Sequence, residues 1–185
     1  MTTMPGWSVR RFRNDEVRGV EVVAPDGQPQ FLVTVDFGST APGVLGKLFD
    51  SLYREGRVPG DRPCIVIPVG GTPVECAPLK KSPYRRRSHT RTLRFAGREY
   101  RYVHRTDRRA VVQCDGETIA RLHRTWQWGR FSRRHTFDDP GFTVTSTSPW
   151  DPVDEAVVFL CGTVIGPPGR EGAIGWLGQE LGSGF

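Results

Sequence analysis

The sequence predicts a mainly β fold in which antiparallel strands surround one hydrophobic helix near the C-terminus. Short runs rich in β-branched and aromatic residues recur between residues 92 and 148, at the spacing of roughly ten residues that is typical of antiparallel sheets. The dipeptide Asp115-Gly116 between two of these runs is a signal for a tight hairpin turn. A run of apolar residues follows at 156–165, between residues that start and stop helices.

Length and composition indicate a globular protein with its own core. The chain has 185 residues, of which 37% are hydrophobic and 25% are charged, as in ordinary folded domains. We predict a single domain over residues 1–185. A subdivision stays open, with strands and a helix in 1–80, a basic β-rich part that contains the core helix in 84–170, and a glycine-rich tail in 171–185.

The predicted strands follow one another along most of the chain. Phe31–Phe37 and Ile65–Val69 are rich in β-branched and aromatic residues, which fit the pleated surface of a sheet. Turn residues such as Ala96-Gly97 separate the later runs. The remaining predicted strands are 92–96, 98–105, 110–114, 118–123, 125–131 and 142–148.

Residues 41–56 interrupt the strands with a helical pattern. Val44, Leu48 and Leu52 recur four residues apart, which places them on one side of a helix. Ser39 precedes the pattern and can cap the helix start. One extra helix is therefore predicted near 41–56.

The apolar run near the C-terminus predicts a buried helix over residues 151–166. Asp151 can cap the helix start and Pro152 suits its first turn, and the Gly-Pro-Pro-Gly sequence at 166–169 stops it. No charged residue lies within 156–165, so the helix has no polar side and must be surrounded by protein or lipid. Because the run is shorter than the roughly 20 residues of a membrane span, we expect protein around it and predict no transmembrane segment.

The cysteines and histidines show no metal-binding spacing. Structural zinc needs closely spaced thiolates, but the four cysteines lie far apart and the four histidines form no HxH or HExxH motif. We therefore predict no metal and no cofactor. The N-terminal residues lack the apolar segment of a secretory signal, so we expect a cytoplasmic protein whose thiols are reduced. The cysteines are Cys64, Cys76, Cys114 and Cys161.

Catalytic motifs are also missing from the sequence. A nucleophilic serine would occupy a GxSxG elbow, and a phosphate-binding P-loop would end in GK[ST]. The sequence contains neither pattern, so no catalytic residue is predicted. An enzyme whose active site is dispersed over the sequence stays open as an alternative.

The strongest functional signal is the charge of residues 85–134. This segment holds fifteen arginines and four acidic residues, a net charge of +11, whereas the whole chain carries +6. Arg98, Tyr100 and Tyr102 fall on one side of a strand because side chains alternate. The alternation repeats from Arg124 to Arg130, with two tryptophans between them. Arginine beside aromatic rings can bind phosphate groups or stack on unpaired bases.

We therefore predict a non-catalytic binding or adaptor domain that engages an anionic partner through an arginine and aromatic face. The partner classes that stay open are a phospholipid headgroup at a peripheral membrane surface, a nucleic acid and an acidic protein. An ordinary solvated surface would show the same pattern, and a structural subunit of a bacterial or phage assembly is an alternative function. The candidate binding residues are Arg85, Arg86, Arg87, Arg98, Tyr100, Tyr102, Arg124, Trp126, Trp128 and Arg130.

Two stretches resemble the tubby C-terminal-like superfamily, which includes the LURP-one-related proteins and the phospholipid scramblases. They are YRYVHRTDRRAVVQCDGETIARLHR at 100–124, with its strand, polar turn and strand, and DPVDEAVVFLCGTVIG at 151–166. The resemblance covers residues 84–166. It implies an antiparallel sheet closed into a barrel-like domain around the helix at 151–166. Members that bind phosphoinositides use basic surface residues, so the resemblance also implies an anionic ligand.

Overall fold

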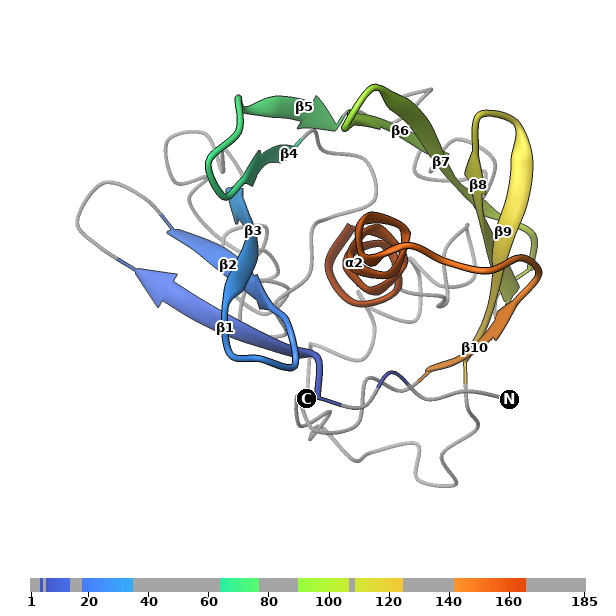
Figure 1. Cartoon of the computed structure of the whole chain (residues 1–185), viewed down its shortest axis with the longest axis horizontal. Coiled ribbons are helices and arrows are strands. Elements are labelled where there is room, and N and C mark those ends of the chain that lie inside the picture. Colours follow the sequence, from blue (N-terminus) through green and yellow to red (C-terminus); the bar gives the residue numbers. More distant parts are fainter. Residues whose placement is uncertain are drawn as a thin grey trace, which may run out of the picture.

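The strands of the protein form two antiparallel sheets with one helix between them (Figure 1). This arrangement is seen in a computed structural model. It describes residues 4, 6–13, 18–34, 64–76, 90–106, 109–124 and 142–165. The mainly β fold that the sequence predicts is confirmed, since ten strands and one helical segment make up the described part.

The first sheet comes from the N-terminal part of the chain and has five strands in sequence order. Each strand is antiparallel to the next, so the sheet is a simple meander. The strands are β1 (Ser8–Arg13), β2 (Arg18–Val23), β3 (Pro29–Thr34), β4 (Cys64–Pro68) and β5 (Val74–Cys76).

The second sheet is also a five-stranded meander, and it contains most of the basic segment. Its tight turns have the conformation that the sequence predicts, because Asp115 and Gly116 both adopt a positive φ, at 48° and 92°, as a two-residue hairpin loop requires. The strands are β6 (Arg91–Phe95), β7 (Arg98–His104), β8 (Arg109–Cys114), β9 (Glu117–Arg124) and β10 (Phe142–Ser146).

The expected closed barrel is not supported. Among the described strands, no pairing joins β5 to β6 or β1 to β10, so each sheet stays open at both edges. Between β5 and β6 the two sheets are joined by a hydrogen bond from a side chain instead of by backbone pairing. Arg91 of β6 donates from Nη1 to the Cys76 carbonyl of β5 at 3.0 Å. The strands nevertheless lie around the helix in a ring (Figure 1).

The predicted C-terminal helix is confirmed at the centre of this ring (Figure 1). It consists of α2 (Pro152–Leu160) and one π-helical turn, η2 (Cys161–Ile165). Asp151 caps the start, since its Oδ1 accepts the Asp154 N–H at 2.8 Å, which satisfies one of the free donors of the first turn.

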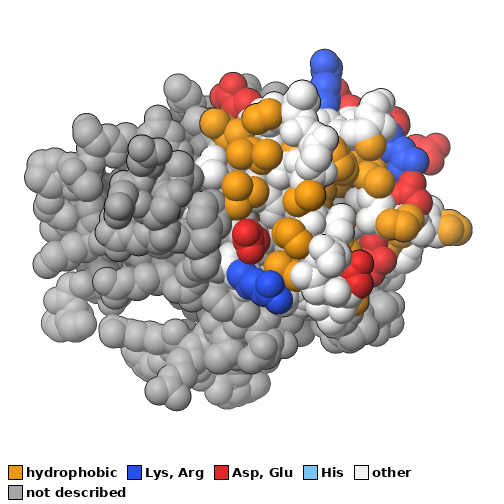
Figure 2. All heavy atoms as spheres, turned by 60° about the vertical axis from the view of Figure 1, so that its left-hand side comes forward, with side chains coloured by type: hydrophobic (Ala, Val, Ile, Leu, Met, Phe, Trp, Pro, Cys, Tyr) orange, Lys and Arg blue, Asp and Glu red, His pale blue; other side chains and the backbone are white. Residues whose placement is uncertain are grey.

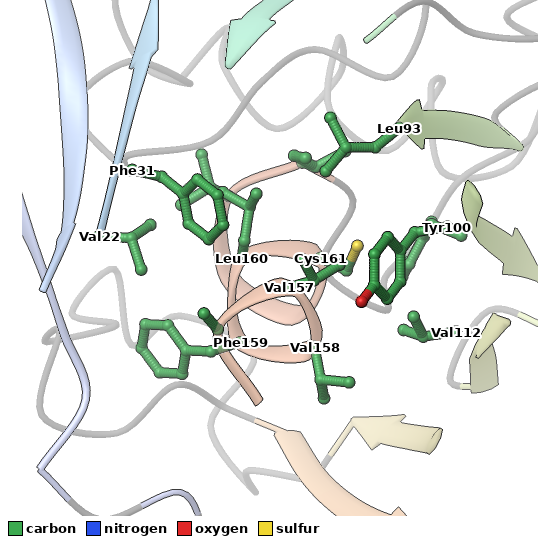
Figure 3. Close-up of a cluster of buried hydrophobic side chains, with 14 of the residues drawn as sticks. Val22, Phe31, Leu93, Tyr100, Val112, Val157, Val158, Phe159, Leu160 and Cys161 are labelled. Atoms are coloured by element: carbon green, nitrogen blue, oxygen red, sulfur yellow. The ribbon is translucent and has the colours of Figure 1, made fainter. Parts of the chain in front are cut away.

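The core forms where the helix meets both sheets (Figure 3). Val157, Val158 and Leu160 are 0% exposed. In the close-up, Phe31 lies beside the helix from the first sheet and Tyr100 from the second. Burying each large apolar side chain contributes about 1.5–3 kcal/mol, so a helix that is apolar on all sides is stable only between the two sheets.

Some expectations lie outside the described residues. These are the extra helix near 41–56, the strand at 125–131 and the glycine-rich tail at 171–185. The sequence analysis did not predict three of the observed strands. These strands are β1, β2 and β5.

Candidate functional site

Strand β7 turns its two tyrosines toward the core and Arg101 toward the surface. Burial alternates along the strand, with Tyr100 and Tyr102 buried and Arg101 half-buried between them, as the pleat of a strand requires. Arg98 shares the inner side with the two tyrosines. This is the grouping that the sequence predicts, but it faces the helix.

Tyr100 and Tyr102 are therefore core residues, which corrects their interpretation as part of an exposed binding face. Tyr100 is 0% exposed and Tyr102 is 1% exposed. Alternation shows which residues share a side but not which side is buried. Their large rings decide the orientation because they remove more apolar area from water than the arginine stems do. An exposed anion-binding face has to lie on the opposite side of the sheet.

Arg98 belongs to an ion-pair network at the start of α2. Its Nη2 lies 2.7 Å from Asp151 Oδ2, and its Nη1 lies 3.1 Å from Asp154 Oδ1. The Tyr100 hydroxyl donates a 2.7 Å hydrogen bond to the same Asp154 oxygen. We call these four residues the capping network. Its carboxylates lie at the positive end of the helix dipole, and its arginine is already paired with acids.

The capping network shifts the pKa values of Tyr100 and Asp151. Burial and the hydrogen bond to Asp154 raise the pKa of Tyr100, so its hydroxyl remains a donor. The Asp154 N–H and the Arg98 guanidinium lower the pKa of Asp151, so this carboxylate remains charged. The network therefore fixes the start of α2 to the second sheet. The charge of Arg98 is used in these two ion pairs.

Five basic residues gather on the outer side of the second sheet. Arg109 is the register partner of His123, and Arg105, which follows β7, donates its N–H to the Arg109 carbonyl at 2.8 Å. Three of the five arginine and histidine side chains are exposed and two are half-buried. We call this group the basic face; it consists of Arg101, Arg105, Arg109, Arg121 and His123.

The dimensions of the basic face follow from strand geometry. Neighbouring strands are about 4.8 Å apart and residues along a strand rise about 3.3 Å each. The face therefore extends about 10 Å across β7, β8 and β9, and about 13 Å from Arg101 to Arg105. An area of this size accommodates several phosphate groups rather than one.

Glu99 borders the basic face, since it lies two residues before Arg101 on the same side of β7. Glu99 is at the start of β7, where it forms a 3.2 Å ion pair with Arg94. Asp115 and Glu117 are at the β8–β9 hairpin. In the part of the chain that the structure describes, none of the ion pairs involves an arginine of the basic face.

Neutral polar groups complete the outer side of the sheet. Thr143 is the register partner of His123, and Thr145 is the partner of Arg121. Threonine hydroxyls can donate hydrogen bonds to an anion beside a guanidinium group. Among the described outer residues of β7 to β10 there is no Phe, Tyr or Trp.

The remaining candidate residues are not placed by the structure. Arg124 ends β9, but only its backbone is described. The sequence analysis did not single out the basic face. The available signal was the alternation in β7 and β9: once the tyrosines are assigned to the core, the odd-numbered arginines must face outward. The candidates outside the described residues are Arg85, Arg86, Arg87, Trp126, Trp128 and Arg130.

Searches for other functional features and for relatives give no match. Within the described ranges, no group of three or more histidine, cysteine or acidic residues is arranged to hold a metal ion. No helix in those ranges is long and apolar enough to cross a membrane. No protein-family model, curated protein or solved structure matches the chain.

Proposed function

We propose that the chain is a non-catalytic binding domain that engages a phosphate-bearing anionic surface through the basic face. The observation that carries this proposal is the group of four outward arginines without an acidic partner among the described residues. Guanidinium groups bind phosphate through paired N–H donors, and they stay charged at all physiological pH values. The arrangement therefore suits phosphate recognition better than recognition of a neutral ligand.

The repulsion within the basic face supports a bound anion. Arg105, just after β7, donates its N–H to the carbonyl of Arg109 on β8, and like charges held this close repel each other. Nothing in the described core requires these outward residues to be basic. An anion bound between them would relieve the repulsion, so binding and stability would be coupled.

Among phosphate-bearing surfaces, we favour the headgroups of a membrane lipid. A single-stranded nucleic acid is held largely by stacking on aromatic side chains, and the described outer side of β7 to β10 has none. Reading a duplex requires a helix or a β-ribbon that enters a groove, whereas the basic face lies on the broad side of a sheet. A headgroup layer requires only a charged surface, and each basic side chain near it contributes about 1 kcal/mol.

We also propose a relationship to the tubby C-terminal-like superfamily. Two antiparallel meanders around an apolar helix support it, since the resemblance implied strands that wrap such a helix. In this proposal the two open sheets correspond to the two halves of the family's barrel. The basic face would then be this chain's counterpart of the basic surface residues that bind phosphoinositides in other members.

A structural subunit remains the second candidate because of the first sheet. Hydrophobic side chains gather on one side of the described part of the molecule (Figure 2). Ile65 is 42% exposed and Val69 is 63% exposed. Contiguous apolar surface is typical of contacts with other proteins, so this side would suit a neighbouring subunit.

Co-sedimentation with vesicles tests the lipid proposal. We expect the protein to bind vesicles that contain a phosphoinositide or phosphatidylserine and not vesicles of phosphatidylcholine alone. Binding should weaken as salt is raised, because exposed charges are screened. Equal binding to neutral vesicles would contradict the proposal. Binding to DNA but not to anionic vesicles would assign the basic face to nucleic acid.

A further inference from the structure

Two cysteines face each other inside the first sheet. Cys64 of β4 and Cys76 of β5 are direct register partners, and they are 1% and 0% exposed. The Cα atoms of directly opposite residues in an antiparallel pair are about 4.5–5.5 Å apart. This is within the range of about 4.4–6.8 Å that a disulfide spans. The sheet thus holds two thiols in a position where they can join.

The two thiols are in contact and are not equivalent. Cys64 Sγ donates to the Cys76 carbonyl at 3.7 Å. Its hydrogen bond with the Cys76 thiol, together with burial, raises the pKa of Cys64. The same hydrogen bond, followed by the nearby Arg91 guanidinium, lowers the pKa of Cys76. Cys64 is thus the hydrogen-bond donor of the pair, and Cys76, which lies beside the Arg91 guanidinium, is the thiol that ionises more readily.

A buried arginine lies against this pair. Arg91 is 2% exposed and reaches from the second sheet to donate to the Cys76 carbonyl at 3.0 Å. Burying a guanidinium is costly unless anionic or acceptor groups surround it. A cation beside a thiol favours the thiolate, which is the reactive form of cysteine.

We propose that Cys64 and Cys76 form a redox-reactive pair that closes to a cross-strand disulfide when a hydroperoxide oxidises it. The Cys76 thiolate attacks the O–O bond, which yields a sulfenic acid and hydroxide. The Cys64 sulfur then attacks the Cys76 sulfur and the S–O bond breaks. The Cys64 proton leaves with the oxygen as water. In total, two thiols lose two electrons and two protons, and hydrogen peroxide is reduced to two waters.

Access of the oxidant requires only a local opening. β5 has three residues and lies at the edge of its sheet. Short edge strands with few ladder bonds open at a small fraction of the cost of global unfolding. A small oxidant can therefore reach Cys76 while the rest of the core stays folded. The disulfide would then fix β5 to β4.

The other two cysteines serve as controls. Cys161 is on the central helix, where burial and the nearby Cys76 thiol raise its pKa, so it tests whether closeness to Cys76 alone is enough for a link. Cys114 is half-buried on β8, and burial together with Asp115 raises its pKa. Neither has a cysteine as a register partner. They should react more slowly than Cys76.

Peptide mapping after oxidation tests the proposal. The folded protein is treated with hydrogen peroxide, free thiols are alkylated, and the digest is analysed by mass spectrometry. We expect a linked Cys64–Cys76 peptide that dithiothreitol removes, in wild type and in Cys161→Ala. In the Cys64→Ala variant the oxidation should stop at a sulfenic acid on Cys76, which dimedone labels. Oxidation of Cys114 without a Cys64–Cys76 link, or a Cys76–Cys161 link instead, would overturn the proposal.

The role of Arg91 is tested in the same assay. Arg91→Lys keeps the charge, so the disulfide should form at close to the wild-type rate. Arg91→Gln removes the charge that favours the Cys76 thiolate, so the disulfide should form several-fold more slowly than in wild type. An unchanged rate in Arg91→Gln would contradict the role of the guanidinium. If that variant does not fold, the peptide map of the wild type still decides whether the pair closes.

Discussion

At the scale of single residues, the close approach of the helix to β10 depends on one glycine. A Cβ built at Gly162 would overlap the ring of Phe142, which is 4% exposed in the core. The absence of a side chain lets the helix turn η2 pack directly against this ring. The requirement is steric, because Gly162 is within a helical segment and needs no unusual backbone conformation.

Substitution of Gly162 by alanine should therefore destabilise the protein. Overpacking a dense core costs about 1–3 kcal/mol, and urea unfolding should show the loss. Phe142→Leu in the same chain should recover part of it by making room for the methyl group. Unchanged stability of Gly162→Ala would show that the ring moves aside freely.

The capping network predicts a pH dependence at the same scale. The Asp154 N–H and the Arg98 guanidinium lower the pKa of Asp151, so the unfolded chain binds a proton at higher pH than the folded one does. The stabilisation is complete above the unfolded value of about 3.9 and is lost as pH falls through the lower folded value.

Asp151→Asn isolates this effect. Asparagine keeps the cap, because it accepts from a backbone N–H as well as aspartate does, but it cannot pair with Arg98 as an anion. We expect the variant to lose less stability than wild type between about pH 5 and pH 2. Thermal unfolding across this range is the measurement. Parallel pH profiles for the two proteins would contradict the assignment.

At the scale of elements, the central helix could be predicted from the sequence, whereas the edge strands β1 and β5 could not. The helix has a cap, a proline in its first turn and an uncharged run, and each signal acts locally. β5 has only three residues, and β1 carries three arginines in six positions, so neither shows a clear alternation. The inward direction of Tyr100 and Tyr102 also depends on tertiary packing, which no local pattern contains.

The buried position of the helix gives a prediction for the whole element. Leu160 is 0% exposed, so Leu160→Asp would place an unpaired carboxylate in the core. The cost of burying this carboxylate and the loss of apolar packing together exceed the net stability of an ordinary domain. We expect no cooperative unfolding transition by circular dichroism. Leu160→Met, which conserves volume, is the matched control, and a cooperatively folded Leu160→Asp protein would contradict the central position of the helix.

At the scale of the whole molecule, the two sheets present different outer surfaces. The second sheet carries the basic face, and the first carries the exposed Ile65 and Val69. The sequence analysis grouped Arg98 with Tyr100 and Tyr102 on one side of β7, and that side faces the core. Which side is buried depends on the helix between the sheets, which lies more than twenty residues beyond β9 in the sequence. A partner on each side would be compatible with an adaptor role.

The most direct test of the proposed function compares a double and a single substitution on the second sheet. Arg109→Ser with Arg121→Ser removes two charges from the basic face. Arg94→Ser removes an exposed arginine that is paired with Glu99 at the other end of the same sheet. At about 1 kcal/mol for each basic side chain at an anionic membrane, the double variant should bind phosphoinositide vesicles about 30-fold more weakly than wild type. Arg94→Ser should bind within about twofold of wild type, because exposed ion pairs contribute little. Wild-type affinity of the double variant, with both proteins folded by circular dichroism, would contradict the account.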